Sequence, residues 1–218
     1  EMCIRDIHKS GLKLFEQESY EGAILDYGKA IDLDPDFADA YNDRGFTYYF
    51  LGKYEKAILD YNKAINLDSD FALAYNNRGF AYYALGEYEQ SIEDYDRALE
   101  LDPNLAVAYY KGLSHYALGE YEHAIEDYST AIKSDPNHSI AYHSRGFVHA
   151  SLGQYQQAIQ DYGMAIKLNP NSALMYNSRG FAYFNLGQYE QAILDHSKSI
   201  RLNPVSYTHL TLPTNREV

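Results

Sequence analysis

Apolar and small side chains recur along this chain at the spacing of one face of an α-helix, in pairs of segments separated by a turn. In residues 38–71, one stripe consists of Ala40, Tyr41, Gly45 and Tyr48, and a second stripe consists of Ala57, Tyr61, Ala64 and Ile65. Intervals of three and four residues are typical of an amphipathic helix. Between the stripes lies Gly52, which can end a helix in the left-handed conformation. The pattern therefore predicts two helices joined by a short turn.

The two-helix pattern repeats with a period of 34 residues wherever a copy is complete. We expect six repeats, at residues 4–37, 38–71, 72–105, 106–138, 139–172 and 173–206. A period of this length indicates one helical hairpin per copy, stacked so that neighbours bury each other's apolar faces. The fourth copy is one residue short, and the loss of a residue inside a helix rotates what precedes it by roughly 100°. We expect this loss to be absorbed near Leu105 to Tyr109, by a shorter turn or a distorted first helical turn.

Small and aromatic residues occupy fixed places in the copies. A glycine recurs in the first helix, where we expect a close approach of two backbones, at Gly11, Gly45, Gly79, Gly112, Gly146 and Gly180. A tyrosine recurs in the second helix, at Tyr27, Tyr61, Tyr95, Tyr128 and Tyr162. Large rings on a stripe between helices are expected to fill the core and not to bind a ligand.

The third copy carries the residues of a known signature, which here are Tyr75, Gly79, Tyr82, Ser91, Tyr95, Ala98 and Pro103. With these residues the chain resembles the tetratricopeptide repeat family over residues 4–206. The resemblance implies an all-α fold, a right-handed superhelical solenoid of antiparallel helix pairs with a concave groove, and a role in binding partner proteins. It implies no particular ligand. Residues 207–218 lack the pattern, and we expect them to be a nonnative or disordered tail.

The charge of the chain limits its partners. The formal net charge of −13 disfavours nucleic acid and anionic membranes, which both require a basic surface. The single cysteine, Cys3, cannot form an internal disulfide, and no apolar run approaches the roughly 20 residues that span a bilayer. We expect a cytoplasmic protein, although the sequence begins with Glu1 and a targeting signal before it would not be visible.

An arginine in the first helix and an aspartate in the second recur together. The arginines occupy a place that is commonly leucine in the family that the chain resembles. The pairs are Arg44 and Asp60, Arg78 and Asp94, Arg145 and Asp161, and Arg179 and Asp195. A half-buried guanidinium group is costly unless it is paired, and a carboxylate offers it two parallel hydrogen bonds. We predict a structural pair between each Arg and the Asp of its own or an adjacent repeat.

A third row along the first helices is the candidate binding surface, because the resemblance implies that this stripe lines the groove. It comprises Asn42, Phe46, Tyr49, Asn76, Phe80, Tyr83, Leu113, Tyr116, His143, Phe147, Asn177 and Phe181. An Asn amide can donate to and accept from a peptide backbone, and aromatic rings offer sequence-tolerant contact. The alternative is that Phe46, Phe80, Phe147 and Phe181 only pack neighbouring first helices together.

Catalytic and metal-binding patterns are not recognisable. His143 and His149 lie six residues apart, whereas metal ligands on one helix face are four apart. We therefore expect no cofactor, no metal and no enzymatic activity. The sequence favours an interaction scaffold that binds an extended peptide or a partner helix. The alternatives are an array that associates with copies of itself through uncapped ends, and a regulatory fragment of a larger enzyme.

Overall fold

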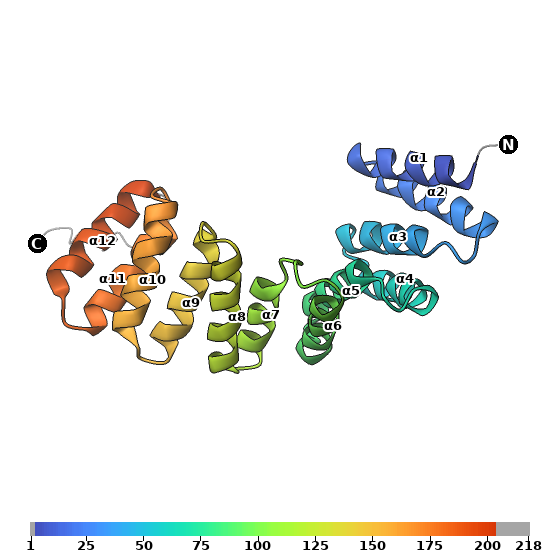
Figure 1. The fold of residues 1–218 in the computed structure, drawn as a ribbon. Helices are drawn as coiled ribbons and strands as arrows, with labels where there is room; N and C mark the ends of the chain where they lie inside the picture. Colours follow the sequence, from blue (N-terminus) through green and yellow to red (C-terminus); the bar gives the residue numbers. More distant parts are fainter. Residues whose placement is uncertain (1–2, 204–218) are drawn as a thin grey trace, which may run out of the picture. The chain divides into compact units, whose positions relative to one another are not determined.

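The computed structural model describes residues 3–203, which form helices and no strands (Figure 1). The twelve helices of this range are α1 (Ile4–Glu16), α2 (Tyr20–Leu33), α3 (Ala38–Phe50), α4 (Tyr54–Leu67), α5 (Ala72–Leu85), α6 (Tyr88–Leu101), α7 (Ala108–Ala117), α8 (Tyr121–Ser134), α9 (Ser139–Ser151), α10 (Tyr155–Leu168), α11 (Ala173–Asn185) and α12 (Tyr189–Leu202). The all-α expectation is confirmed. The predicted tail at 207–218 lies outside the described residues.

The chain divides into two compact units at Gly119. The N-terminal unit contains α1 to α7, and the C-terminal unit begins at Glu120 and contains α8 to α12. Within each unit, consecutive helices pack on one another, as the hairpin repeats predict. No helix within residues 3–203 has the length and apolar character needed to cross a membrane.

A glycine lies in the turn between the two helices of five repeats. Gly52 has a φ of 68°, in the left-handed region that glycine adopts without steric cost, and Gly86, Gly119, Gly153 and Gly187 behave alike. The predicted left-handed turn at Gly52 is therefore present. The turn brings the second helix back against the first.

The two helices of a hairpin approach so closely that the glycine of the first helix has no room for a side chain. A Cβ placed on Gly45 would lie 2.8 Å from Cε1 of Tyr61 and 3.2 Å from the carbonyl oxygen of Ala57. The ring of Tyr61 is fully buried there, as are the rings of Tyr27, Tyr95, Tyr128 and Tyr162. These tyrosines form the core of the hairpins.

The fourth repeat absorbs its missing residue at the start of its first helix. This helix, α7, has 10 residues, whereas α5 has 14. Residues 102–107 separate α6 from α7, a longer connection than residues 68–71 between α4 and α5. The first helical turn is therefore lost, as one of the two alternatives predicted, whereas the alternative of a shorter turn is wrong.

Candidate functional site

Each arginine of the recurring row lies against the aspartate of its own repeat. Arg44 donates from Nε to Oδ2 of Asp60 over 2.8 Å and from Nη2 to Oδ1 over 2.7 Å. The same two-pronged pair joins Arg78 to Asp94, Arg145 to Asp161, and Arg179 to Asp195. Each pair thus links the first helix of a repeat to its second helix.

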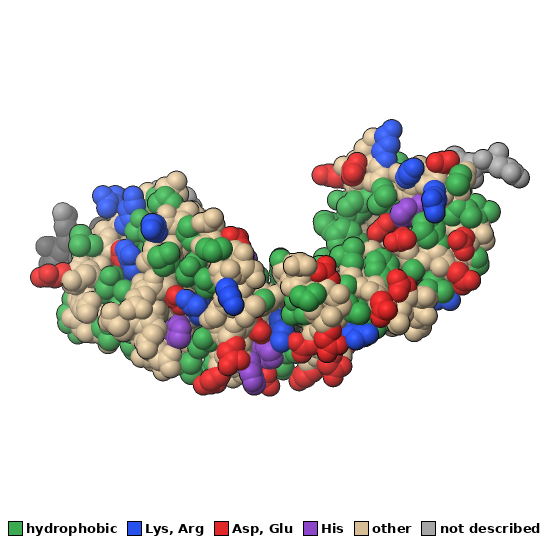
Figure 2. Space-filling view, viewed as in Figure 1, with side chains coloured by type: hydrophobic (Ala, Val, Ile, Leu, Met, Phe, Trp, Pro, Cys, Tyr) green, Lys and Arg blue, Asp and Glu red, His purple; other side chains and the backbone are tan. Residues whose placement is uncertain are grey.

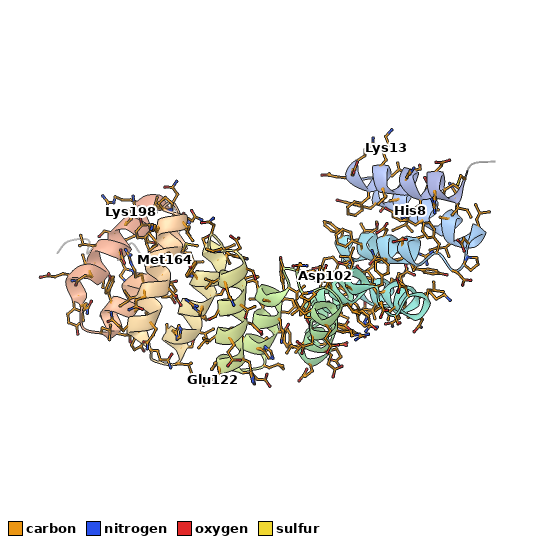
Figure 3. All side chains as sticks on the ribbon, viewed as in Figure 1. His8, Lys13, Asp102, Glu122, Met164 and Lys198 are labelled. Carbon is orange, nitrogen blue, oxygen red and sulfur yellow. The ribbon has the colours of Figure 1, made fainter. Side chains whose placement is uncertain are left out.

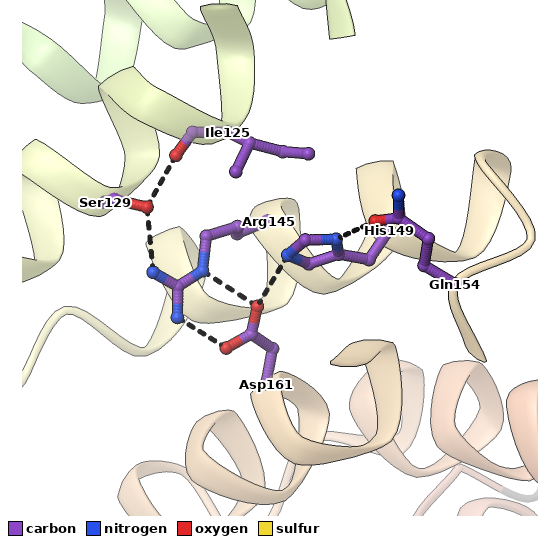
Figure 4. Close-up of polar contacts among 6 residues, drawn as sticks. All are labelled: Ile125, Ser129, Arg145, His149, Gln154 and Asp161. Atoms are coloured by element: carbon purple, nitrogen blue, oxygen red, sulfur yellow. Dashed lines mark hydrogen bonds and ion pairs between the residues drawn. The ribbon is translucent and has the colours of Figure 1, made fainter. Parts of the chain in front are cut away.

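The guanidinium group also reaches the preceding repeat. Nη1 of Arg145 donates to Oγ of Ser129 on α8 over 2.9 Å (Figure 4). Nε2 of His149 lies 3.9 Å from Oδ2 of Asp161 on the other side of the carboxylate. The hydrogen bonds to Asp161 raise the pKa of Arg145, while burial acts in the opposite direction. These polar groups are thus engaged with one another within the fold, and the structural role predicted for the row stays a prediction.

A second polar row connects the first helices of the N-terminal unit. Nε2 of His8 lies 2.7 Å from Oδ2 of Asp43, and the amide of Asn42 donates to Oδ1 of Asp43 over 3.1 Å. Asn77 in turn donates to Oδ1 of Asn42 over 3.0 Å. These bonds run from α1 through α3 to α5. His8 is labelled on α1 in Figure 3.

This row includes Asn42 and Asn76, two members of the predicted binding surface, and both are largely buried. Asn42 is 2% exposed and Asn76 is 8% exposed. The amide of Asn76 donates to Asn77 over 3.4 Å, and its Oδ1 has no partner. The next first helix carries Tyr110 at the place of Asn77, and its ring lies 4.5 Å from that of Phe80. The polar row therefore ends at Asn76.

The C-terminal unit repeats this arrangement with neutral groups. Nε2 of His143 lies 3.0 Å from Oγ of Ser178, and Nδ1 of His196 lies 3.1 Å from Oδ1 of Asn177. Burial lowers the pKa of His143. A neutral imidazole on α9 thus links this helix to α11.

The aromatic residues of the predicted groove differ between the units. In the N-terminal unit, the ring of Phe46 lies 5.5 Å from that of Phe15, and Tyr49 lies 6.5 Å from Phe80. The packing alternative therefore describes part of the role of Phe46 and Phe80. Tyr83, Leu113 and Tyr116 are half-buried on α5 and α7.

In the C-terminal unit, Phe147 is 46% exposed and Phe181 is 55% exposed. Rings that are this exposed are not held by packing alone, and they form an apolar surface on α9 and α11.

Each unit has a pocket beside these rings. The N-terminal pocket encloses about 370 Å³ and is lined by Leu12, Phe15, Glu16, Tyr27, Asn42, Asp43, Phe46, Leu73 and Asn77. The C-terminal pocket encloses about 660 Å³ and is lined by Phe147, Ala150, Ser151, Tyr155, Tyr162, Leu174, Asn177, Ser178, Phe181 and His196. In the space-filling view, hydrophobic side chains gather at the edge of the N-terminal unit formed by α1 and α3 (Figure 2).

The two pockets are built from the same places in the repeats. Their residue numbers differ by 135 (181 − 46 = 135), which is four periods of 34 less the residue missing from the fourth copy. The matched residues are Leu12 and Phe147, Phe15 and Ala150, Glu16 and Ser151, Tyr27 and Tyr162, Asn42 and Asn177, Asp43 and Ser178, and Phe46 and Phe181.

The predicted binding surface contained some of the residues that line the pockets and omitted others. Phe15, Glu16 and Asp43 were not among the candidates, although they line the N-terminal pocket. Phe15 lies at the place that Tyr49 occupies in the second copy, but the first copy was not included in the predicted surface. Glu16 and Asp43 each lie one residue after a place of the stripe. Comparing every place of the repeat, and not only the stripe, would have revealed them.

Comparisons with known proteins give a consistent result. Family models described as "TPR repeat" match residues 11–52, 47–86, 112–153 and 149–187, and those described as "Tetratricopeptide repeat" match residues 72–105 and 173–204. A search of curated proteins finds no match.

Several solved structures share the fold. The structure of pilF from Pseudomonas aeruginosa is 20% identical, has a TM-score of 0.79, and is matched over 95% of this chain and 96% of that chain. YrrB, described as a TPR protein with an unusual peptide-binding site, is 23% identical, with a TM-score of 0.72 and coverage of 82% and 92%. MamA from Desulfovibrio magneticus is 20% identical, with a TM-score of 0.73 and coverage of 77% and 96%. At these identities the likeness concerns the fold alone.

Proposed function

Because the chain belongs to the tetratricopeptide repeat family, whose members form scaffolds typical of protein–protein interaction, we propose that it is a noncatalytic module that binds extended peptide segments of partner proteins. The observation that carries this proposal is the pair of pockets at matched places on the first helices. A peptide lying across the first helices would insert one side chain into a pocket and cover the neighbouring rings.

The proposed contact surface is mainly aromatic. In the N-terminal unit it comprises Phe46, Tyr49, Phe80 and Tyr83, and in the C-terminal unit Phe147, Asn177 and Phe181. Aromatic side chains suit this role because they offer a large contact area and lose little conformational entropy. One solved structure with this fold, YrrB, is described as having a peptide-binding site, which is in keeping with the proposal.

The buried amides support the surface from beneath. Asn42 and Asn77 join α3 to α5 by a hydrogen bond of 3.0 Å and hold Phe46 and Phe80 on neighbouring helices. A surface that is rigid before binding loses less entropy when a peptide docks. We therefore give Asn42 and Asn76 a positioning role, in place of the direct contact that the sequence favoured.

The polar pair formed by His143 and Ser178 does not favour an enzyme. His143 and Ser178 are within hydrogen-bonding distance, but both lie inside helices α9 and α11. Backbone N–H groups in a helix interior are bonded to carbonyl groups, so they cannot stabilise an oxyanion beside the serine. A binding pocket accounts for the geometry without this requirement.

Peptide arrays displaying random decamers would test the proposal, followed by affinity measurements on the best peptides. We expect Phe46→Ala and Phe181→Ala each to weaken peptides of one pocket by about tenfold, because truncating an aromatic anchor costs more than about 1 kcal/mol. The matched control is Leu59→Ala, since Leu59 is 68% exposed on the second helix α4. Unchanged affinities in both phenylalanine variants would place binding elsewhere.

Self-association is a second candidate, favoured by the apolar surface of the last hairpin. Ile193 and Leu194 on α12 are 65% and 69% exposed. An exposed apolar face of this kind can be covered by another copy of the chain. Light scattering over a concentration series, with Ile193→Glu as the variant, tests it: a mass that stays monomeric at every concentration excludes this candidate.

A further inference from the structure

The two pockets differ in charge at two matched places. Glu16 and Asp43 line the N-terminal pocket, where Ser151 and Ser178 line the C-terminal one. The surrounding places keep their chemical character, with Tyr, Asn and Phe at the same positions of both pockets. The two pockets therefore share most of their lining but differ in charge, and the charge changes which side chain each pocket can bind.

Both carboxylates of the N-terminal pocket retain capacity for a ligand. Asp43 accepts from His8 and from Asn42, yet an ionised carboxylate offers about four acceptor sites. Its side chain is 24% exposed. Glu16 is exposed, and within residues 3–203 no hydrogen bond or ion pair engages it.

The two negative charges act on the same part of the pocket. Burial raises the pKa of Tyr27, and the charges of Asp43 and Glu16 strengthen this effect. No Lys or Arg lines the pocket to neutralise them. Lys13, on the same helix as Glu16, points away from α3 (Figure 3).

Aromatic rings flank the carboxylates. Phe15 and Phe46, with centroids 5.5 Å apart, both line the pocket. The face of a phenyl ring attracts a cation, and the methylene stem of a long basic side chain packs well against such rings. Rings beside carboxylates that retain acceptor sites therefore match a side chain with an apolar stem and a positive end.

We propose that the N-terminal pocket binds the Lys or Arg side chain of a partner peptide, whereas the C-terminal pocket takes an uncharged apolar or aromatic side chain. This inference rests on the peptide-binding function proposed above. The stem lies against Phe15 and Phe46, and the positive end meets Asp43 and Glu16. The net charge of −13 favours the approach of a basic segment.

The C-terminal pocket has no charge to offer. Its polar lining consists of hydroxyl, amide and imidazole groups, and the side chains of Asn177 and His196 already bond to each other. A charged side chain would lose its hydration there without gaining an opposite charge. The larger volume of this pocket, where Ala150 stands in the place of Phe15, suits a bulky neutral side chain.

The test uses fluorescein-labelled hexapeptides with apolar flanks that differ at one central residue: Lys, Arg, norleucine, phenylalanine or Glu. Norleucine has the stem of lysine without its charge. We expect the parent chain to bind the Lys and Arg peptides about tenfold more tightly than the norleucine peptide at the N-terminal pocket, because norleucine can form neither the cation–π contact nor the ion pair. The preference should fall at high salt, and the Glu peptide should bind worst.

The variants assign this preference to the two carboxylates. Glu16→Gln with Asp43→Asn should remove the preference for Lys while leaving norleucine binding unchanged. Glu16→Gln alone, which breaks no internal bond, should reduce it. The charge-matched control, Glu18→Gln with Asp36→Asn, removes two charges outside the pocket and should preserve it.

A transplant gives the converse test. In the neutralised background, Ser151→Glu with Ser178→Asp should create a preference for Lys at the C-terminal pocket. Peptides that bind with no difference between Lys and norleucine, or a preference that survives neutralisation of Glu16 and Asp43, would overturn this inference and leave the proposed function standing. Failure of every peptide to bind would instead overturn the proposed function.

Discussion

The N-terminal and C-terminal pockets are two versions of one construction. Tyr27 and Tyr162 occupy the same buried place in the walls of the two pockets. Each pocket is also lined by an Asn and a Phe from the first helix of the following repeat. The side chains that differ are those that shape the opening. The two pockets enclose about 370 and about 660 Å³. The buried residues of the repeat thus give both pockets the same framework, whereas the residues at the opening differ between them.

One core place of the repeat carries a tyrosine in α4 of the N-terminal unit and a histidine in α12 of the C-terminal unit. Tyr61 in α4 and His196 in α12 occupy the same place of the repeat, above Gly45 and Gly180. The ring of Tyr61 is fully buried, whereas His196 borders the C-terminal pocket. We expect the core to be more tightly sealed in the N-terminal unit.

Tyr61→Ala should therefore cost far more than His196→Ala. Removing a fully buried ring costs about 4 kcal/mol, from lost burial and the cavity that remains, and the smaller His196 side chain about 1 kcal/mol. Urea unfolding followed by circular dichroism measures both. A Tyr61→Ala variant no less stable than His196→Ala would refute the stated difference in sealing.

The hydroxyl of Tyr61 provides the control. It is buried, and no residue between 3 and 203 forms a hydrogen bond with it. Tyr61→Phe keeps the ring and removes the unpaired hydroxyl, so we expect stability to stay equal or to rise by up to about 1 kcal/mol. This variant separates the contribution of the ring from that of the polar atom.

The Arg–Asp pairs should contribute equally to stability in the two units. Arg44 and Arg179 have side chains that are 22% exposed, and their partners Asp60 and Asp195 are 10% and 9% exposed. Replacing either with Leu leaves a nearly buried carboxylate unpaired, which we expect to cost about 2 kcal/mol in each case. Thermal or urea unfolding should show equal losses, and stability at or above that of the parent would refute the supporting role. Arg97 is the control, because its side chain is 42% exposed and those of its acidic partners are at least 66% exposed, and Arg97→Leu should change stability by less than about 0.5 kcal/mol.

The sequence was sufficient to predict the repeats and the helices, because apolar periodicity and turn glycines such as Gly52 are local signals. It also predicted that each Arg pairs with an Asp, because an unpaired guanidinium group beside an apolar face is costly. It did not reveal that Asn77 of the next repeat bonds to Asn42, because that contact depends on how closely two first helices approach. The lost first turn of α7 was only one of two predicted alternatives, because the missing residue does not by itself show whether the turn or the helix is shortened.

The hydrogen bonds between first helices should contribute more to stability in the N-terminal unit than in the C-terminal unit. Asn77 is 6% exposed, and Asn77→Ala removes the donor to Asn42, leaving a buried acceptor without that partner. We expect a loss of about 1.5 kcal/mol. At the same place, Ser178 is half-buried, and Ser178→Ala should cost only about 0.5 kcal/mol. Unfolding curves that show equal losses would remove this distinction between the units.

The smallest expected effect concerns pH and His143. Burial lowers the pKa of His143 in the fold, whereas an unfolded histidine protonates near pH 6.5. Below that pH the unfolded chain binds the proton more readily, so the contribution of His143 to stability is fully present above about pH 6.5 and is lost as the pH falls towards the lower folded pKa. His143→Gln should therefore flatten the decline in stability between pH 7 and 5, measured as urea midpoints. The control His123→Gln, at an exposed position on α8, should keep the parental slope. If the stability of His143→Gln falls as steeply as that of the parent, protonation of the buried His143 is not what destabilises the fold in acid.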